Sequence, residues 1–152
     1  MIEDVAKGNI FATTLRNIAF AINAGGKNDS GFAGQVLELF TPRFNKTGKR
    51  NLGEVITVET EGKIFHGLVC HRFGLNGWEK SPETITACLD KINLAPGDAI
   101  AVVLMGSGFL GRLEGADVAA NIRAIHRSRN KCIIYSLDID KKAIMAIVNS
   151  LI

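Results

Sequence analysis

The chain has 152 residues, of which 47% are hydrophobic and 22% are charged, and its formal net charge is +3. This length and composition are typical of a soluble globular protein with its own hydrophobic core, so residues 1–152 are predicted to form a single domain. The small positive charge suits an anionic ligand, but it is too weak by itself to indicate a nucleic-acid-binding protein.

Sorting and redox features indicate a cytoplasmic protein. The first residues contain no basic stretch followed by an apolar one, and no apolar run approaches the roughly 18 residues of a membrane span. The three cysteines, Cys70, Cys88 and Cys132, form no Cys-x-x-Cys pair and lie in apolar patterns, which favours buried thiols. No Cys/His cluster has the spacing of metal ligands, so no metal site and no cofactor are expected.

The first third of the chain predicts strands and one helix. Residues 2–11 suit a short edge strand that ends in Gly8-Asn9-Ile10, and the unbroken apolar run in 17–23 suits a strand buried on both faces. A helix is expected over about 31–41, where Pro42 marks its end. Residues 43–53 combine basic side chains with Gly and Asn, and they predict a solvated loop.

The remaining elements continue this alternation. Residues 54–60 and 63–70 predict a hairpin around Glu61-Gly62. A loop is expected over 73–80, a helix after its N-cap Ser81, a central strand over 99–105, a helix over about 114–127, a strand over 132–137 and a last helix over about 140–151. The residues expected on the inner faces of these three helices are Ile85, Cys88, Leu89 and Ile92; Val118, Ile122 and Ile125; and Ala143, Ile144, Ile147 and Leu151. The pattern predicts an α/β fold with a mixed sheet and helices on both faces.

Two glycine-rich loops each follow an apolar strand and precede a helix. The first lies between Asn23 and the helix at 31, and the second is Gly106–Gly111. Such loops point backbone N–H groups at the space above a helix N-terminus, where a phosphate is favoured. Ligands of open α/β sheets lie at the carboxyl ends of strands. If the two strands are neighbours, the loops could hold a diphosphate; the alternative is that both are merely tight connections.

The second loop also permits another interpretation. It lacks the Lys and Ser/Thr of a nucleoside-triphosphate P-loop, since Arg112-Leu113 follows Gly111. It does match Gly-x-Gly-x-x-Gly, and Asp138 follows near the end of the next strand. A nicotinamide-dinucleotide-binding domain that uses Gly106–Gly111 is therefore an alternative hypothesis.

Three motifs resemble those of macro domains in order and spacing. Ile22-Asn23-Ala24 followed by Gly31-Phe32-Ala33-Gly34-Gln35-Val36 resembles the first ligand loop of that family, and Leu104–Gly111 is similar to the second. Gly8-Asn9-Ile10 resembles the Gly-Asp-Ile of the first strand. The resemblance covers about residues 5–137, leaves the last helix as an addition, and looks closest to the branch that removes ADP-ribose from acidic side chains.

The resemblance implies a three-layer α/β/α macro-domain-like fold that binds ADP-ribose or an ADP-ribosylated macromolecule. Asn9 and Ile10 would meet the adenine, and Asn23 and Ala24 would line the distal-ribose pocket. One phosphate would be held by Ser30, Gly31, Phe32 and Ala33, and the other by Gly106, Ser107, Gly108, Phe109 and Leu110.

The resemblance leaves catalysis open. An Asn usual in the first loop falls on Gly26, and His71 falls near the position of the nucleophilic Lys of that branch, whose partner Asp has no clear counterpart here. Asp29 or His71 could assist the hydrolysis of ADP-ribosyl esters or of ADP-ribose 1″-phosphate. Asp29 could equally be a helix cap, and His71 a surface histidine. A non-catalytic interaction module, with protein or nucleic acid as its partner, is a further alternative.

Overall fold

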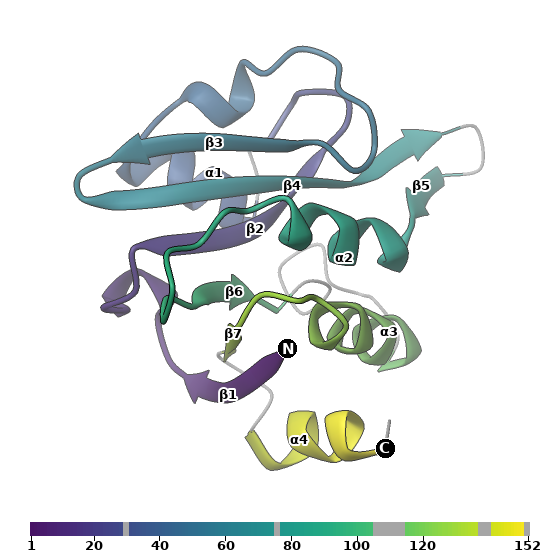
Figure 1. Ribbon diagram of the computed structural model, residues 1–152. Helices are drawn as coiled ribbons and strands as arrows, with labels where there is room; N and C mark the ends of the chain where they lie inside the picture. The colour runs from purple at the N-terminus through teal and green to yellow at the C-terminus, as the bar shows by residue number, and fades with distance from the viewer. Residues whose placement is uncertain (29–30, 75–76, 105–114, 137–140, 151–152) are drawn as a thin grey trace.

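The computed structural model describes residues 1–28, 31–74, 77–104, 115–136 and 141–150. Within these ranges the strands form a seven-stranded sheet with the order β1-β7-β6-β2-β4-β3, and β5 pairs with β4 (Figure 1). The strands are β1 (Ile2–Lys7), β2 (Asn17–Asn23), β3 (Val55–Thr60), β4 (Lys63–Gly74), β5 (Gly77–Lys80), β6 (Ile100–Val103) and β7 (Cys132–Ser136). The helices are α1 (Gly31–Leu39), α2 (Pro82–Asp90), α3 (Gly115–His126) and α4 (Lys141–Asn149), with 3₁₀ turns η1 (Ile10–Ala12) and η2 (Arg43–Asn45).

The sheet is mixed, as predicted. Strands β1, β7, β6, β2 and β4 are parallel to their neighbours, whereas β3 and β5 run antiparallel to β4. The two strands that precede the glycine-rich loops are adjacent, since Asn17 to Ala19 of β2 pair with Ile100 to Val102 of β6. Parallel neighbours end at the same edge of a sheet, so the condition set for a shared crevice is met.

Two hydrophobic clusters fill the space between the sheet and its helices. The larger side chains of β2, Ile18, Phe20 and Ile22, pack in the cluster that contains α1 and η2, while Ala19 belongs to the cluster of α2, α3 and α4. The residues of β2 on that second face, Ala19 and Ala21, are small, so the helices can approach the strand closely. The result is the three-layer α/β/α arrangement that was predicted (Figure 1).

Two sequence-based expectations about local structure are wrong. Residues 73–80 are not a plain loop, because β4 continues to Gly74 and its backbone pairs with β5 from Gly77 onward. The Asn76-Gly77 dipeptide is typical of hairpin turns, and the glycines obscured that signal. In α4 the error concerns Ala143, which is exposed, whereas Val148 is buried. Ile144 is buried and Ile147 packs against the core as expected, and Leu151 lies outside the described residues.

The other expected helix faces and the first hairpin are confirmed. Val118, Ile122 and Ile125 of α3 are buried, as are Ile85, Cys88, Leu89 and Ile92 in and after α2. The turn between β3 and β4 places Glu61 at φ 51° and Gly62 at φ 76°, which is the left-handed backbone of a two-residue hairpin. Among the described helices, none is both long and apolar enough to cross a membrane.

Candidate functional site

Predicted site residues from three strands gather at the carboxyl edge of the parallel sheet. Asn9 follows β1, Asn23 ends β2, and the chain leaves β6 at the same edge after Leu104. His71 of β4 is the Cα partner of Asn23 across the β2–β4 ladder. The structure therefore brings Asn23, which is predicted to line the distal-ribose pocket, side by side with His71, which falls near the position of the nucleophilic Lys in the resembling branch.

Several predicted site residues lie outside the described residues. These are Asp29, Ser30, Gly106, Ser107, Gly108, Phe109 and Leu110. Gly31 is the first residue of α1, so the helix begins where the phosphate cradle is predicted. The helix cap and the second loop remain predictions.

A buried asparagine that the sequence analysis did not single out organises the loop after β2. Asn28 is 6% exposed. Its Oδ1 accepts a hydrogen bond from the Asn23 backbone N–H at 2.7 Å, and its Nδ2 donates to the Phe44 carbonyl at 2.9 Å. Its own N–H donates to Asn45 Oδ1 at 2.7 Å. One side chain thus ties the end of β2 to η2, and the signal that could have found it is an Asn placed just before the helix start.

Gly26 stands in this loop for a steric reason. Its φ is +88°, and a Cβ built on it would lie 2.4 Å from the carbonyl oxygen of Gly48. The two segments are held together by the Arg50 N–H, which donates to the Ala24 carbonyl at 2.8 Å. The Asn that the resemblance leads one to expect at this position therefore has no room for its side chain.

The residues predicted to meet the adenine adjoin a cluster of aromatic rings. Asn9 caps η1 by accepting the Phe11 N–H on its Oδ1 at 3.0 Å, and Ile10 is buried. The half-buried Phe11 ring stacks on Phe32 with centroids 5.0 Å apart and an interplanar angle of 15°. The Phe32 and Ala33 side chains pack into the core, so a phosphate at α1 would contact backbone N–H groups rather than these side chains.

His71 is half-buried at the end of the β2–β4 ladder. Its backbone carbonyl accepts the Ala24 N–H at 3.0 Å, and its Nδ1 lies 3.9 Å from the Cys70 sulfur. Burial raises the pKa of Cys70 to about 12, so this thiol stays protonated and is a poor nucleophile. The role of His71 in proton transfer stays a prediction.

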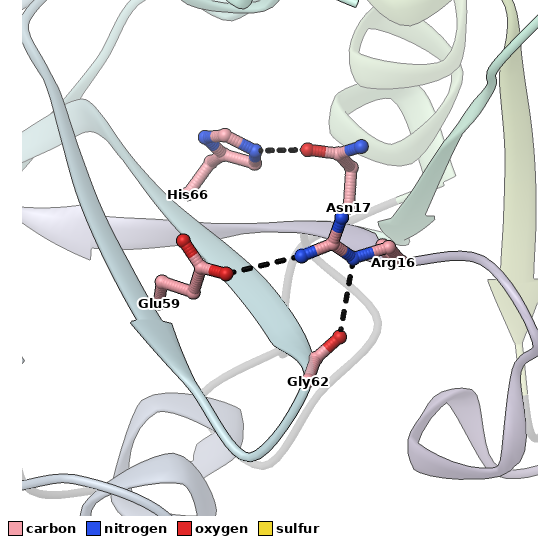
Figure 2. Close-up of polar contacts among 5 residues, drawn as sticks. All are labelled: Arg16, Asn17, Glu59, Gly62 and His66. Atoms are coloured by element: carbon pink, nitrogen blue, oxygen red, sulfur yellow. Dashed lines mark hydrogen bonds and ion pairs between the residues drawn. The ribbon is translucent and has the colours of Figure 1, made fainter.

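A concave region lies at the amino end of β2. This pocket has a volume of about 470 Å³ and is lined by Asn17, Val55, Thr57, Glu59, Ile64, His66, Lys91, Ile92 and Asn93. His66 Nε2–H donates to Asn17 Oδ1 at 2.8 Å, and its Nδ1 is 2.9 Å from the Thr57 hydroxyl. Figure 2 shows His66 directed toward Asn17, and beside them Arg16 bound to Glu59 at 3.0 Å.

This network joins three strands rather than presenting reactive groups. Burial lowers the pKa of His66 to about 4, so its ring is neutral near pH 7 and Nδ1 accepts the Thr57 hydroxyl hydrogen. Both ring nitrogens are then occupied by neighbouring side chains. In the part of the chain that the structure describes, no group of three or more His, Cys, Asp or Glu side chains is placed to hold a metal ion.

Comparison with known proteins identifies the fold. No protein-family model matches the sequence, and no curated protein is significantly similar to it. The Oceanobacillus iheyensis macrodomain with MES bound superposes with a TM-score of 0.66 at 14% identity, over 97% of this chain and 90% of that one. The macrodomain of Mycobacterium tuberculosis DarG gives a TM-score of 0.63 at 19% identity, over 89% and 97%.

A viral protein contains the same fold within a longer chain. Alphavirus P23pro-zbd matches 97% of this chain with a TM-score of 0.59 at 15% identity, and the chain spans 23% of that protein. These likenesses, at identities below one fifth, establish the architecture.

Proposed function

We propose, on the premise that this chain has the macrodomain fold, that it binds ADP-ribose or an ADP-ribosyl group at the carboxyl edge of β2 and β6. The adenine lies near Asn9 and Ile10, the diphosphate lies between the start of α1 and residues 106–110, and the distal ribose lies near Asn23 and Ala24. The ligand assignment comes from the resemblance of the loop motifs, and its placement follows the strand order.

The adjacency of β2 and β6 is the observation that carries this proposal. Each strand leads into a glycine-rich segment, and the two strands are parallel neighbours with Ile18 opposite Ala101. Anion-binding backbone at two neighbouring strand ends suits two linked phosphates. The half-buried Phe11, which stacks on Phe32 and donates its N–H to Asn9, supports an apolar surface at the proposed adenine end.

Calorimetric titration with ADP-ribose, NAD and AMP tests the binding. The expected result is binding of ADP-ribose and no binding of AMP. Gly31→Glu should weaken ADP-ribose binding by at least about tenfold, or about 1.4 kcal/mol, because a carboxylate would enter the phosphate cradle. Gln35→Glu is the matched control, since it adds the same charge on an exposed position of α1. Equal affinity of the two variants would contradict the placement.

We further propose that any hydrolysis at this site uses water, with His71 or Asp29 as the proton-transferring group. The position of His71 opposite Asn23 supports this role. Turnover should be measured on ADP-ribosylated protein, ADP-ribosylated nucleic acid and ADP-ribose 1″-phosphate. His71→Ala and Asp29→Ala should reduce turnover more than they reduce ADP-ribose affinity, and an effect on affinity alone would assign them to binding.

The dinucleotide alternative has one structural argument in its favour. β6, α3 and β7 form a parallel β-α-β unit, and Gly106-x-Gly108-x-x-Gly111 lies between β6 and α3. Tighter binding of NAD than of ADP-ribose in the same titration would favour it. Failure of both ligands would leave the non-catalytic interaction module.

A further inference from the structure

We propose that residues 41–53, here called the basic segment, form a surface that binds the phosphate backbone of a nucleic acid beside the loop after β2. This inference does not depend on ADP-ribose binding. It adds a macromolecular partner and places that partner next to the loop after β2.

The basic segment concentrates the positive charge of the chain. It contains Arg43, Lys46, Lys49 and Arg50 and no acidic residue, so it contributes +4. The whole chain has a net charge of +3, which leaves −1 for everything else. All four side chains are exposed. The weak overall charge therefore conceals a local positive field.

Unlike some bases elsewhere in the molecule, these four cations have no carboxylate partner among the described residues. Arg16 binds Glu59 at 3.0 Å, and Lys141 binds Asp4 at 2.6 Å. Among the residues that the structure describes, no ion pair involves a side chain of the basic segment. Arg50 donates its Nε–H to the Thr47 carbonyl at 2.9 Å, a bond that leaves its charge uncompensated by any described carboxylate. The charges are therefore available to an external anion.

The basic segment is anchored rather than loose. Phe44 is fully buried, and its carbonyl accepts a hydrogen bond from Asn28. The backbones of Gly48 and Arg50 lie against Gly26 and Ala24 of the loop after β2. The anchored backbone fixes the positions from which the four charged side chains project, so binding does not have to order the main chain of the segment. A strand bound here lies next to the predicted distal-ribose pocket.

Charge without an apolar anchor favours nucleic acid over an acidic peptide or a lipid surface. The large apolar residues inside the segment, Phe44 and Leu52, pack into the core cluster. Peptide recognition needs side-chain pockets, and surface insertion into lipid needs exposed apolar groups. Phosphate contacts by Lys and Arg need neither, and they are independent of base sequence.

The salt dependence of oligonucleotide binding tests the proposal on the full chain. Fluorescence anisotropy should be measured with a mixed-sequence duplex and with its single strand. Arg43→Gln, Lys46→Gln and Lys49→Gln together remove three charges whose side chains make no hydrogen bond within the described residues. For duplex DNA, three phosphate contacts correspond to a slope of about −2.7 when the logarithm of the affinity is plotted against the logarithm of the salt concentration. This slope means that the affinity falls about 40-fold between about 50 and 200 mM salt. The triple variant should lose this part of the slope.

A matched variant separates position from total charge. The control variant carries Lys63→Gln, Lys131→Gln and Lys142→Gln, which remove the same charge from the start of β4, the residue before β7 and α4. It should leave most of the slope in place. Equal slopes for the two triple variants would overturn the proposal. So would equally tight binding of a polyglutamate peptide or an anionic vesicle, which would assign the surface to that partner. The ADP-ribose titration is read separately, so its failure leaves this result intact.

Discussion

Replacing Gly26 by alanine tests whether the loop after β2 is fixed by its contact with the basic segment. The alanine Cβ would lie 2.4 Å from the Gly48 oxygen and 2.8 Å from its carbonyl carbon. Both are backbone atoms, so no side-chain rotation relieves the contact. The positive φ of +88° adds a second cost, because left-handed backbone disfavours residues with a Cβ.

The magnitude follows from these two costs. Left-handed backbone costs about 1–2 kcal/mol for alanine. Forcing a methyl group into a closely packed site costs about 1–3 kcal/mol. Gly26→Ala should therefore lower the free energy of unfolding by about 2–5 kcal/mol, measured by urea denaturation with a fixed m-value. Such a loss is a large fraction of the stability of a typical domain.

Gly48→Ala is the matched control for backbone strain alone. Gly48 has a φ of +68°, but a Cβ there has no atom within 4 Å. Gly48→Ala should therefore lower the free energy of unfolding only by the cost of left-handed backbone, about 1–2 kcal/mol. If the two variants lose the same stability, the approach of Gly26 to Gly48 is not a rigid contact and the reasoning fails.

Three further substitutions or conditions probe other parts of the molecule. Asn28→Ala leaves the Asn23 N–H and the Phe44 carbonyl without their partner, so the free energy of unfolding measured in urea should fall by about 1–3 kcal/mol. Asn28→Asp should restore stability only in part, because it keeps the acceptor for Asn23 and lacks the donor for Phe44. Burial lowers the pKa of His66 from 6.5 to about 4, so between these pH values the unfolded chain takes up a proton that the folded chain does not. The contribution of His66 to the free energy of unfolding should be complete above about pH 6.5 and should decrease toward pH 4 by up to roughly 3 kcal/mol. His66→Gln should remove this pH dependence. Burial raises the pKa of Cys70 to about 12 and the pKa values of Cys88 and Cys132 to about 11. A disulfide reagent at about pH 8 should therefore label these thiols only as fast as the protein unfolds. Rapid labelling of the folded protein would contradict their burial.

Most of the architecture could be predicted from the sequence because each apolar pattern is compatible with one main type of element, either a buried strand or an amphipathic helix. The run from Ile18 to Ile22 could only be buried on both faces, and it became the strand between β6 and β4. The faces of α2 and α3 followed from helical spacing. The 73–80 segment was misread because Gly and Asn indicate loops and tight hairpins alike, and only the pairing partner distinguishes them.

The candidate site was less predictable because its supports are distant in sequence. Asn23 and His71 are 48 positions apart, and only the strand register makes them neighbours. Asn28 reads as an ordinary loop residue until Phe44 and Asn45 are placed against it. Motif spacing locates residues along a chain, whereas a polar network depends on which segments pack together.

The contrast between Gly26 and Asn28 sharpens what the first loop is built to do. A motif read by spacing predicts an asparagine at Gly26 that would face the ligand. The structure instead uses position 26 for a left-handed turn against Gly48, and it uses the amide of Asn28, two residues later, to join β2 to η2. Because both devices rest on residues 44–50, the shape of this loop depends on a segment well outside the motif. The basic segment and the loop after β2 therefore pack as one folded unit, so a change in either segment should shift the other.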